Sequence, residues 1–309
     1  MRLLSASAAV LVALTSAPAL AAAPPRLTLS GGAQLPYHAS HSLSGAREPT
    51  SAVVVVHGTG RNAKGYYDRM VSAAGGTARR TVIIAPHFQT KDDRPAPRDA
   101  YWANGGAHSW KDGGDAEQPR GLSSFTAMDE LLRVLADKGR FPSLGKITLV
   151  GHSAGGQFAQ RYAAGSRVAG ELRIGVGFAV ANPSSYLYLS PQRPLGVGSC
   201  REYDDYKYGL QRRNPYLATP SAEQIRGWYG ARRVTYLLGE RDTERDGSLD
   251  TDCPAEVQGR NRFERGSAYF AAIQRQFPAA PHRKVTVPGV GHDSGGMFSS
   301  AQGRTVIFG

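Results

Sequence analysis

The sequence predicts an α/β protein in which a mostly parallel central sheet is covered by helices on both faces. Two observations carry this prediction. Short apolar runs alternate along the chain with segments of helical periodicity, which is typical of strand–helix–strand units. The run at residues 52–56 is apolar at every position, as expected for a strand buried on both faces. A chain of 309 residues is also long enough for one such domain with a substantial core.

The strands and helices follow in a regular order. Strands are expected at residues 52–56, 81–85, 147–150, 175–180, 234–238 and 284–287, with a weaker one at residues 27–29. Helices are expected at residues 66–78, 124–135, 156–164 and 263–276. The helix at 124–135 is the best marked, because Ser123 is a preferred N-cap residue and apolar residues recur at helical spacing behind it.

Two long segments interrupt this alternation, at about residues 91–120 and 184–228. The first is rich in Gly, Pro and Asp, and the second in Tyr, Arg and Pro. Loops of such length inside a compact domain are usually functional or disordered. We expect both inserts to line a site, or to form a small cap, within a single catalytic domain at residues 22–309.

The N-terminus has the pattern of a secretory signal peptide. Arg2 precedes an apolar, Ala-rich stretch that ends in the small-x-small sequence Ala19-Leu20-Ala21. This stretch is short for a membrane anchor, and no later segment is long and apolar enough to span a bilayer. We therefore expect residues 1–21 to be removed, and the protein to be secreted or periplasmic with no stable membrane anchor.

The cysteine count fits an exported protein. Only Cys200 and Cys253 occur, and two cysteines in an oxidising compartment predict one disulfide. The bond would join the second insert to the loop that follows the strand at 234–238. The alternative is a pair of free, buried thiols.

The chain is basic, with a formal net charge of +12. This excess could steer the protein to anionic surfaces or acidic polymers. The basic residues are scattered and form no stripe interleaved with aromatic residues, so nucleic-acid binding is not expected.

The most informative motif is Gly151-His152-Ser153-Ala154-Gly155. It has the form G-x-S-x-G and lies between the strand at 147–150 and the helix at 156–164. A serine at the apex of so tight a turn is strained and projects above the sheet, and glycines on both sides leave room for strand and helix to pass. The sequence therefore predicts that Ser153 is a nucleophile.

An acid and a histidine follow in the chain order expected for a catalytic triad. Asp242 comes just after the strand at 234–238, and His292 lies in a Gly-rich loop after the strand at 284–287. Serine needs a base to take its proton, imidazole can be that base, and a carboxylate holds the imidazole in the useful tautomer. Asp242 is nearest the strand end and is the predicted acid, with Asp246 as the alternative.

Together with His57-Gly58-Thr59-Gly60, these motifs resemble the α/β-hydrolase superfamily over residues 51–292. Within it the chain is most similar to secreted bacterial serine esterases and polyester depolymerases. The resemblance implies an oxyanion hole made by the backbone N–H groups of Thr59 and Ala154.

The resemblance implies a serine hydrolase that cleaves a small or polymeric carboxylic ester through an acyl-enzyme. A serine peptidase and a feruloyl-type esterase are alternatives on the same fold, because pocket shape rather than the triad selects the substrate. A non-catalytic extracellular binding protein is an alternative of another class. No cofactor or metal is expected, since the sequence has no His-Glu-x-x-His motif, no Cys/His cluster and no calcium-loop spacing.

Overall fold

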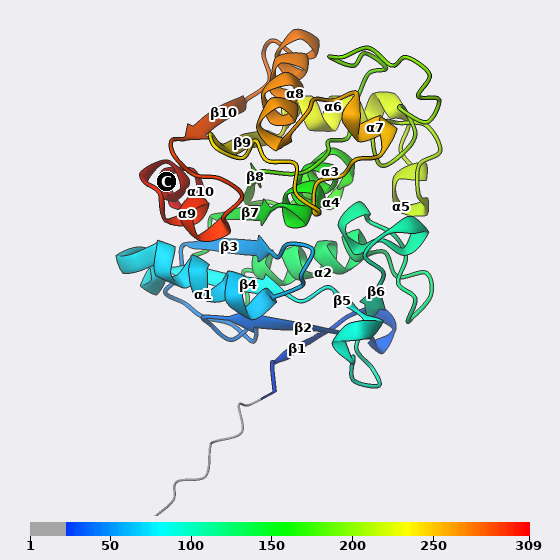
Figure 1. Ribbon diagram of the computed structural model, residues 1–309. Coiled ribbons are helices and arrows are strands. Elements are labelled where there is room, and N and C mark those ends of the chain that lie inside the picture. Colours follow the sequence, from blue (N-terminus) through cyan, green and yellow to red (C-terminus); the bar gives the residue numbers. More distant parts are fainter. Residues whose placement is uncertain (1–22) are drawn as a thin grey trace, which may run out of the picture.

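An eight-stranded sheet forms the centre of the molecule, with the strand order β1-β2-β4-β3-β7-β8-β9-β10 (Figure 1). The computed structural model describes residues 23–309, so the predicted signal peptide at residues 1–21 lies outside the described residues. From β4 to β10 all neighbouring strands are parallel, whereas β2 pairs antiparallel with both β1 and β4. The predicted mostly parallel sheet is confirmed.

The strands of this sheet are β1 (Arg26–Thr28), β2 (Gln34–Ala39), β3 (Ser51–Val56), β4 (Thr81–Pro86), β7 (Lys146–His152), β8 (Gly175–Ala181), β9 (Arg233–Gly239) and β10 (His282–Val287). A separate pair consists of β5 (Gln89–Thr90) and β6 (Tyr101–Trp102). All the strands expected from the sequence are present. The sequence did not predict β2, because Pro36 and neighbouring polar residues weaken its strand pattern.

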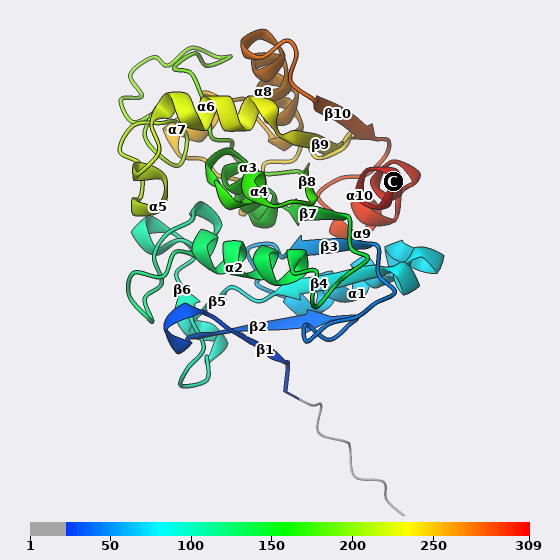
Figure 2. The same cartoon turned by 180° about the vertical axis from the view of Figure 1, so that it is seen from behind.

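Helices cover both faces of the sheet, and Figures 1 and 2 show the two faces from opposite sides. One face carries α1 (Ala63–Ala74), α9 (Ser294–Ser299) and α10 (Ala301–Phe308). The other carries α2 (Ser124–Ala136), α3 (Ala154–Gly165), α6 (Ala222–Ala231) and α8 (Arg262–Gln276). Shorter helices are α4 (Val168–Glu171), α5 (Pro215–Ala218) and α7 (Cys253–Glu256).

The alternation of side chains along β3 explains why both faces are apolar. Val53 and Val55 pack in the cluster of α1, α9 and α10, while Val54 and Val56 pack in the larger cluster on the opposite face. All four side chains are buried. The uninterrupted apolar run predicted this two-sided burial correctly.

Local signals explain where two helices begin and end. Ser123 caps α2 as predicted, since its hydroxyl accepts a hydrogen bond from the Phe125 N–H at 3.1 Å. The helix α1 ends at Ala74, earlier than expected. Gly75 has φ 53°, a left-handed conformation that suits glycine and ends the helix, and residues 75–80 continue as 3-10 turns.

The two inserts are joined to each other above the carboxyl ends of the strands. The Asn214 side-chain amide of the second insert donates to the Asp112 and Gly113 carbonyl oxygens of the first, at 2.8 and 2.9 Å. Asp112 also forms an ion pair of 3.0 Å with Arg161 of α3, whose side chain is fully buried. The inserts are therefore fixed by polar contacts to one another and to α3. The second insert is less irregular than expected, because it contains α5 and residues 222–228 of α6.

The predicted disulfide is present. Cys200 in the second insert is joined to Cys253, the first residue of α7, and their Cα atoms are 5.8 Å apart. The bond ties the second insert to the segment that follows β9. Within residues 23–309, no helix has the combined length and apolarity that crossing a bilayer requires.

Candidate active site

Ser153 lies at the turn between β7 and α3 in a strained conformation, with φ 58° and ψ −120°. The glycines around it are required by close backbone approach. A Cβ atom on Gly151 would lie 1.9 Å from the Gly155 carbonyl oxygen, and one on Gly155 would lie 2.2 Å from the Val56 carbonyl oxygen. No larger residue fits at either position, so the turn can form only with glycine there.

The structure brings Ser153, His292 and Asp242 together from the carboxyl ends of three parallel strands, β7, β10 and β9. His292 Nε2 lies 3.0 Å from the Ser153 hydroxyl oxygen. His292 Nδ1 lies 2.7 Å from Asp242 Oδ2. With the proton on Nδ1 donated to the carboxylate, Nε2 is free to accept the proton of the serine hydroxyl.

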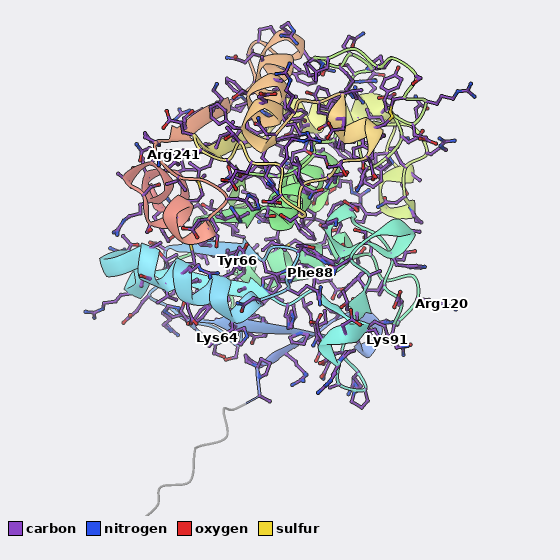
Figure 3. All side chains as sticks on the ribbon, viewed as in Figure 1. Lys64, Tyr66, Phe88, Lys91, Arg120 and Arg241 are labelled. Atoms are coloured by element: carbon purple, nitrogen blue, oxygen red, sulfur yellow. A yellow bond between two sulfur atoms is a disulfide. The ribbon has the colours of Figure 1, made fainter. Side chains whose placement is uncertain are left out.

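The structure separates the two candidate acids. The Asp242 side chain is 1 % exposed and contacts the imidazole of His292. The preceding residue, Arg241, is exposed (Figure 3). Asp246 has a side chain that is 39 % exposed and accepts hydrogen bonds from Arg262 and Ser248 instead. The Arg262 guanidinium holds the pKa of the Asp246 carboxyl well below its usual range.

The loop between β3 and α1 lies beside Ser153. A Cβ atom on Gly58 would come within 3.8 Å of the Ser153 Cβ and 2.7 Å of the Tyr66 hydroxyl oxygen. The Gly58 carbonyl oxygen accepts hydrogen bonds from His57 Nδ1 and from the Arg61 N–H, each at 3.0 Å. Since a trans peptide points its C=O and N–H in opposite directions, these bonds turn the Thr59 N–H away from His57.

The two predicted oxyanion donors are unpaired. Among the described residues, neither the Thr59 N–H nor the Ala154 N–H has a hydrogen-bond acceptor. Ala154 begins α3, where the first N–H groups of a helix have no partner within the helix. The helix start also favours a nearby negative charge.

His57 supports the loop that carries Thr59 and does not contact the hydroxyl of Ser153. Its side chain is completely buried, and burial lowers the pKa of its imidazole to about 3, so the ring is neutral. Nε2 accepts a hydrogen bond from the Phe88 N–H at 3.1 Å, which leaves the proton on Nδ1 for the Gly58 carbonyl. The Trp110 ring packs against the imidazole, with ring centroids 4.6 Å apart.

A second buried histidine supports the ring of His292. The ring centroids of His152 and His292 are 4.6 Å apart, and the Tyr66 hydroxyl lies 3.2 Å from His152 Nδ1. Burial lowers the pKa of His152 well below its usual range, so it packs as a neutral ring. Figure 3 shows Tyr66 and Phe88 in the middle of the molecule, and both are buried. They are packing residues of the site rather than walls of an open pocket.

Sequence reasoning missed two residues that contact the site. Arg262, the first residue of α8, approaches Asp242, and no local pattern marks it. Asn182 contacts the turns that carry Asp242 and His292. Its position directly after a strand, at the same sheet edge as the triad, is a signal that could have identified it. No group of three His, Cys, Asp or Glu side chains placed to hold a metal ion occurs in residues 23–309.

Solved structures of known hydrolases have the same architecture. A poly(3-hydroxybutyrate) depolymerase from Bordetella parapertussis is similar over 90% of this chain and 85% of its own, with 23% identity and a TM-score of 0.64. Poly(aspartic acid) hydrolase-1 from Sphingomonas sp. KT-1 is similar over 94% of this chain and 100% of its own, with 22% identity and a TM-score of 0.67. This chain has the α/β-hydrolase fold. No protein-family model and no curated protein sequence matches it.

The site corresponds to the places where the α/β-hydrolase fold carries its chemistry. In that fold the nucleophile stands on a sharp strand-to-helix turn, and Ser153 lies on a turn of this kind between β7 and α3. In that fold the oxyanion donors come from the residue after the nucleophile and from the loop after an earlier strand, and the predicted donors Ala154 and Thr59 occupy the equivalent positions. The chain order Ser153, Asp242, His292 also agrees with the fold.

Proposed function

We propose that this protein is a secreted serine hydrolase that cleaves carboxylic esters through an acyl-enzyme. The single observation that carries the proposal is the pair of hydrogen bonds that links Ser153 to His292 at 3.0 Å and His292 to Asp242 at 2.7 Å. In such a hydrogen-bonded chain the imidazole acts as a general base and activates a serine hydroxyl that is otherwise a poor nucleophile.

The reaction runs in two halves. The Ser153 hydroxyl oxygen attacks the ester carbonyl carbon while His292 Nε2 takes the hydroxyl proton, and the N–H groups of Thr59 and Ala154 receive the oxyanion. His292 then gives the proton to the leaving alkoxide, and the C–O bond of the ester breaks. Water repeats the sequence on the acyl-enzyme and releases the carboxylic acid. Each oxyanion donor is worth about 3 kcal/mol in the transition state.

The ester preference is supported by the polyester depolymerase among the similar structures, and the poly(aspartic acid) hydrolase keeps an amide-bond alternative open. The same triad serves several acyl substrates, so a serine peptidase and a feruloyl-type esterase are the competing activities. A panel of p-nitrophenyl esters of graded acyl length, a feruloyl ester, a matched p-nitroanilide and a soluble polyester separates them. The ester proposal is wrong if the anilide is hydrolysed faster than its matched ester.

The decisive test compares Ser153→Ala with the exposed control Ser299→Ala. We expect Ser153→Ala to lower kcat on p-nitrophenyl butyrate by about 10⁶-fold and to abolish labelling by a fluorophosphonate, with the unfolding midpoint unchanged. The control should retain both properties. A wild-type protein that neither turns over esters nor reacts with the fluorophosphonate would be a binding protein on a hydrolase scaffold.

Secretion is supported by the leader pattern at residues 1–21 and by the disulfide, since such bonds persist in oxidising compartments. We propose that residues 22–309 form the mature, single-domain enzyme. Mass spectrometry of protein recovered from the periplasm or the medium should give a chain that begins at Ala22. Recovery of the intact chain from the cytoplasm would contradict the proposal.

A further inference from the structure

The dipeptide Ala181–Asn182, at the end of β8, contacts the turns that carry all three triad residues. The Ala181 carbonyl oxygen accepts a hydrogen bond from the Ser153 N–H at 3.0 Å. The Asn182 side chain then reaches in two directions. Its Oδ1 accepts a hydrogen bond from the Gly239 N–H at 2.8 Å, and its Nδ2 donates to the Gly291 carbonyl oxygen at 3.3 Å.

We propose that Asn182 is a positioning residue that sets the place of Asp242 and His292 relative to Ser153. This inference rests on the proposed function. The turn at residues 239–242 (the acid turn) and the turn at residues 288–292 (the base turn) otherwise meet mainly through backbone bonds such as that from the Arg241 N–H to the Val290 carbonyl oxygen, at 2.9 Å. Asn182 joins both turns to the strand beside the nucleophile.

Several features show that the position requires asparagine. The residue is 1 % exposed and has φ 46°, a left-handed conformation that asparagine tolerates better than most residues. One amide oxygen and one amide nitrogen are needed to accept from one turn and donate to the other. The contact is also tight on the side of the acid turn, because a Cβ atom on Gly239 would lie 2.6 Å from the Val290 carbonyl oxygen and 3.2 Å from Asn182 Nδ2.

The arrangement has a direct consequence for catalysis. His292 lies one residue beyond the Gly291 carbonyl that Asn182 holds, and Asp242 lies three residues beyond the Gly239 N–H. A displacement of either turn changes the distance from Nε2 to the serine hydroxyl. A misplacement of about 1 Å can reduce the rate about 100-fold without altering substrate contacts.

Two variants separate the contributions of the side chain. Asn182→Asp keeps the acceptor for Gly239 but places an oxygen against the Gly291 carbonyl, so it removes the link to the base turn. Asn182→Gly keeps the left-handed backbone at no steric cost and removes both links. The matched control is Asn214→Asp. The Asn214 amide also both donates and accepts: its Nδ2 donates to the Asp112 and Gly113 carbonyl oxygens and its Oδ1 accepts from the Leu217 N–H, and none of these bonds involves the acid turn or the base turn.

We expect both Asn182 variants to lower kcat on p-nitrophenyl butyrate about 100-fold and to change KM less than about threefold. The control should lose stability and keep its kcat. A readout independent of turnover is the downfield proton NMR resonance of His292 Nδ1–H, which is hydrogen-bonded to Asp242 at 2.7 Å. It should be lost or broadened in both variants and retained in the control.

The outcomes distinguish this inference from the proposed function. If the Asn182 variants keep the resonance and the kcat of the wild type, Asn182 does not position the triad. A fall in stability with unchanged kcat would equally reduce Asn182 to a structural residue. If the wild type shows the resonance but hydrolyses no ester, the proposed function fails, and loss of the resonance in the variants still supports the positioning role.

Discussion

The guanidinium of Arg262 lies 3.6 Å from Asp242 Oδ1, the carboxylate oxygen that His292 does not use. The same side chain lies 3.0 Å from Asp246 Oδ1 and is fully buried. One cation therefore faces two carboxylates of the same loop. The guanidinium compensates the buried negative charge of Asp242 and donates a hydrogen bond to Asp246. Asp242 is therefore the carboxylate that contacts the imidazole of His292.

This relationship predicts unequal effects of removing the two acids. Asp242→Asn should lower kcat about 10⁴-fold, because the amide cannot hold His292 in the tautomer that accepts the serine proton. Asp246→Asn preserves the triad and should lower kcat far less, with its main effect on stability. Steady-state kinetics on a short p-nitrophenyl ester measures both, and a larger loss in Asp246→Asn would show that the acid has been misassigned.

Arg262 itself should be important for stability. Arg262→Gln leaves the buried carboxylate of Asp242 without its compensating cation, and breaking a buried ion pair typically costs about 3–5 kcal/mol. We expect a reduction of that size in the free energy of unfolding, measured by urea denaturation. Arg245→Gln is the control, because its ion pair with Glu256 is partly exposed and should contribute less than about 1 kcal/mol. Equal losses in the two variants would rule out the role assigned to Arg262.

The buried histidines predict that the protein loses stability in acid. Burial lowers the pKa of His57 to about 3 and also lowers the pKa values of His152 and His282. The unfolded chain binds protons on these residues below about pH 6.5, whereas in the folded chain each of them takes up its proton only at a lower pH. The stabilising contribution of these neutral histidines is therefore full above pH 6.5 and falls as the pH decreases below it. His57, with a folded-state pKa of about 3, contributes a slope of about 1.4 kcal/mol per pH unit over the lower part of this range.

Urea denaturation at pH 8, 6 and 5 tests this dependence. His57→Gln cannot take up a proton, so the pH slope of its unfolding free energy between pH 6 and 5 should be smaller than that of the wild type by about 1.4 kcal/mol per pH unit. An unchanged slope would mean that His57 is protonated in the folded state.

The disulfide should stabilise the protein by constraining the unfolded chain. Its cysteines are separated by 53 residues, and disulfides of this kind typically contribute about 2–4 kcal/mol. We expect a reducing agent to lower the urea midpoint of the wild type and to leave unchanged that of a variant with both Cys200→Ser and Cys253→Ser. If reduction has no effect on the wild type, the bond adds nothing to folding stability.

Much of the fold could be predicted from the sequence because its signals are local. The apolar run of β3, the cap at Ser123 and the glycines around Ser153 each follow from the chemistry of a few neighbouring residues. The strand β2 escaped prediction because its residues gain their strand conformation from pairing with β4, which lies more than forty residues further along the chain.

Motif, spacing and cysteine count were enough to predict the elbow at Ser153, the chain order of the proposed triad and a disulfide between the two cysteines. Only the folded arrangement shows that Asp242, and not Asp246, contacts the imidazole of His292, and that Arg262 and Asn182 lie beside these residues. The two aspartates lie four residues apart in one loop and have the same chemistry. Only the position of the loop relative to β10 and α8 brings one carboxylate to the imidazole and the other to the guanidinium, and no local pattern encodes that position.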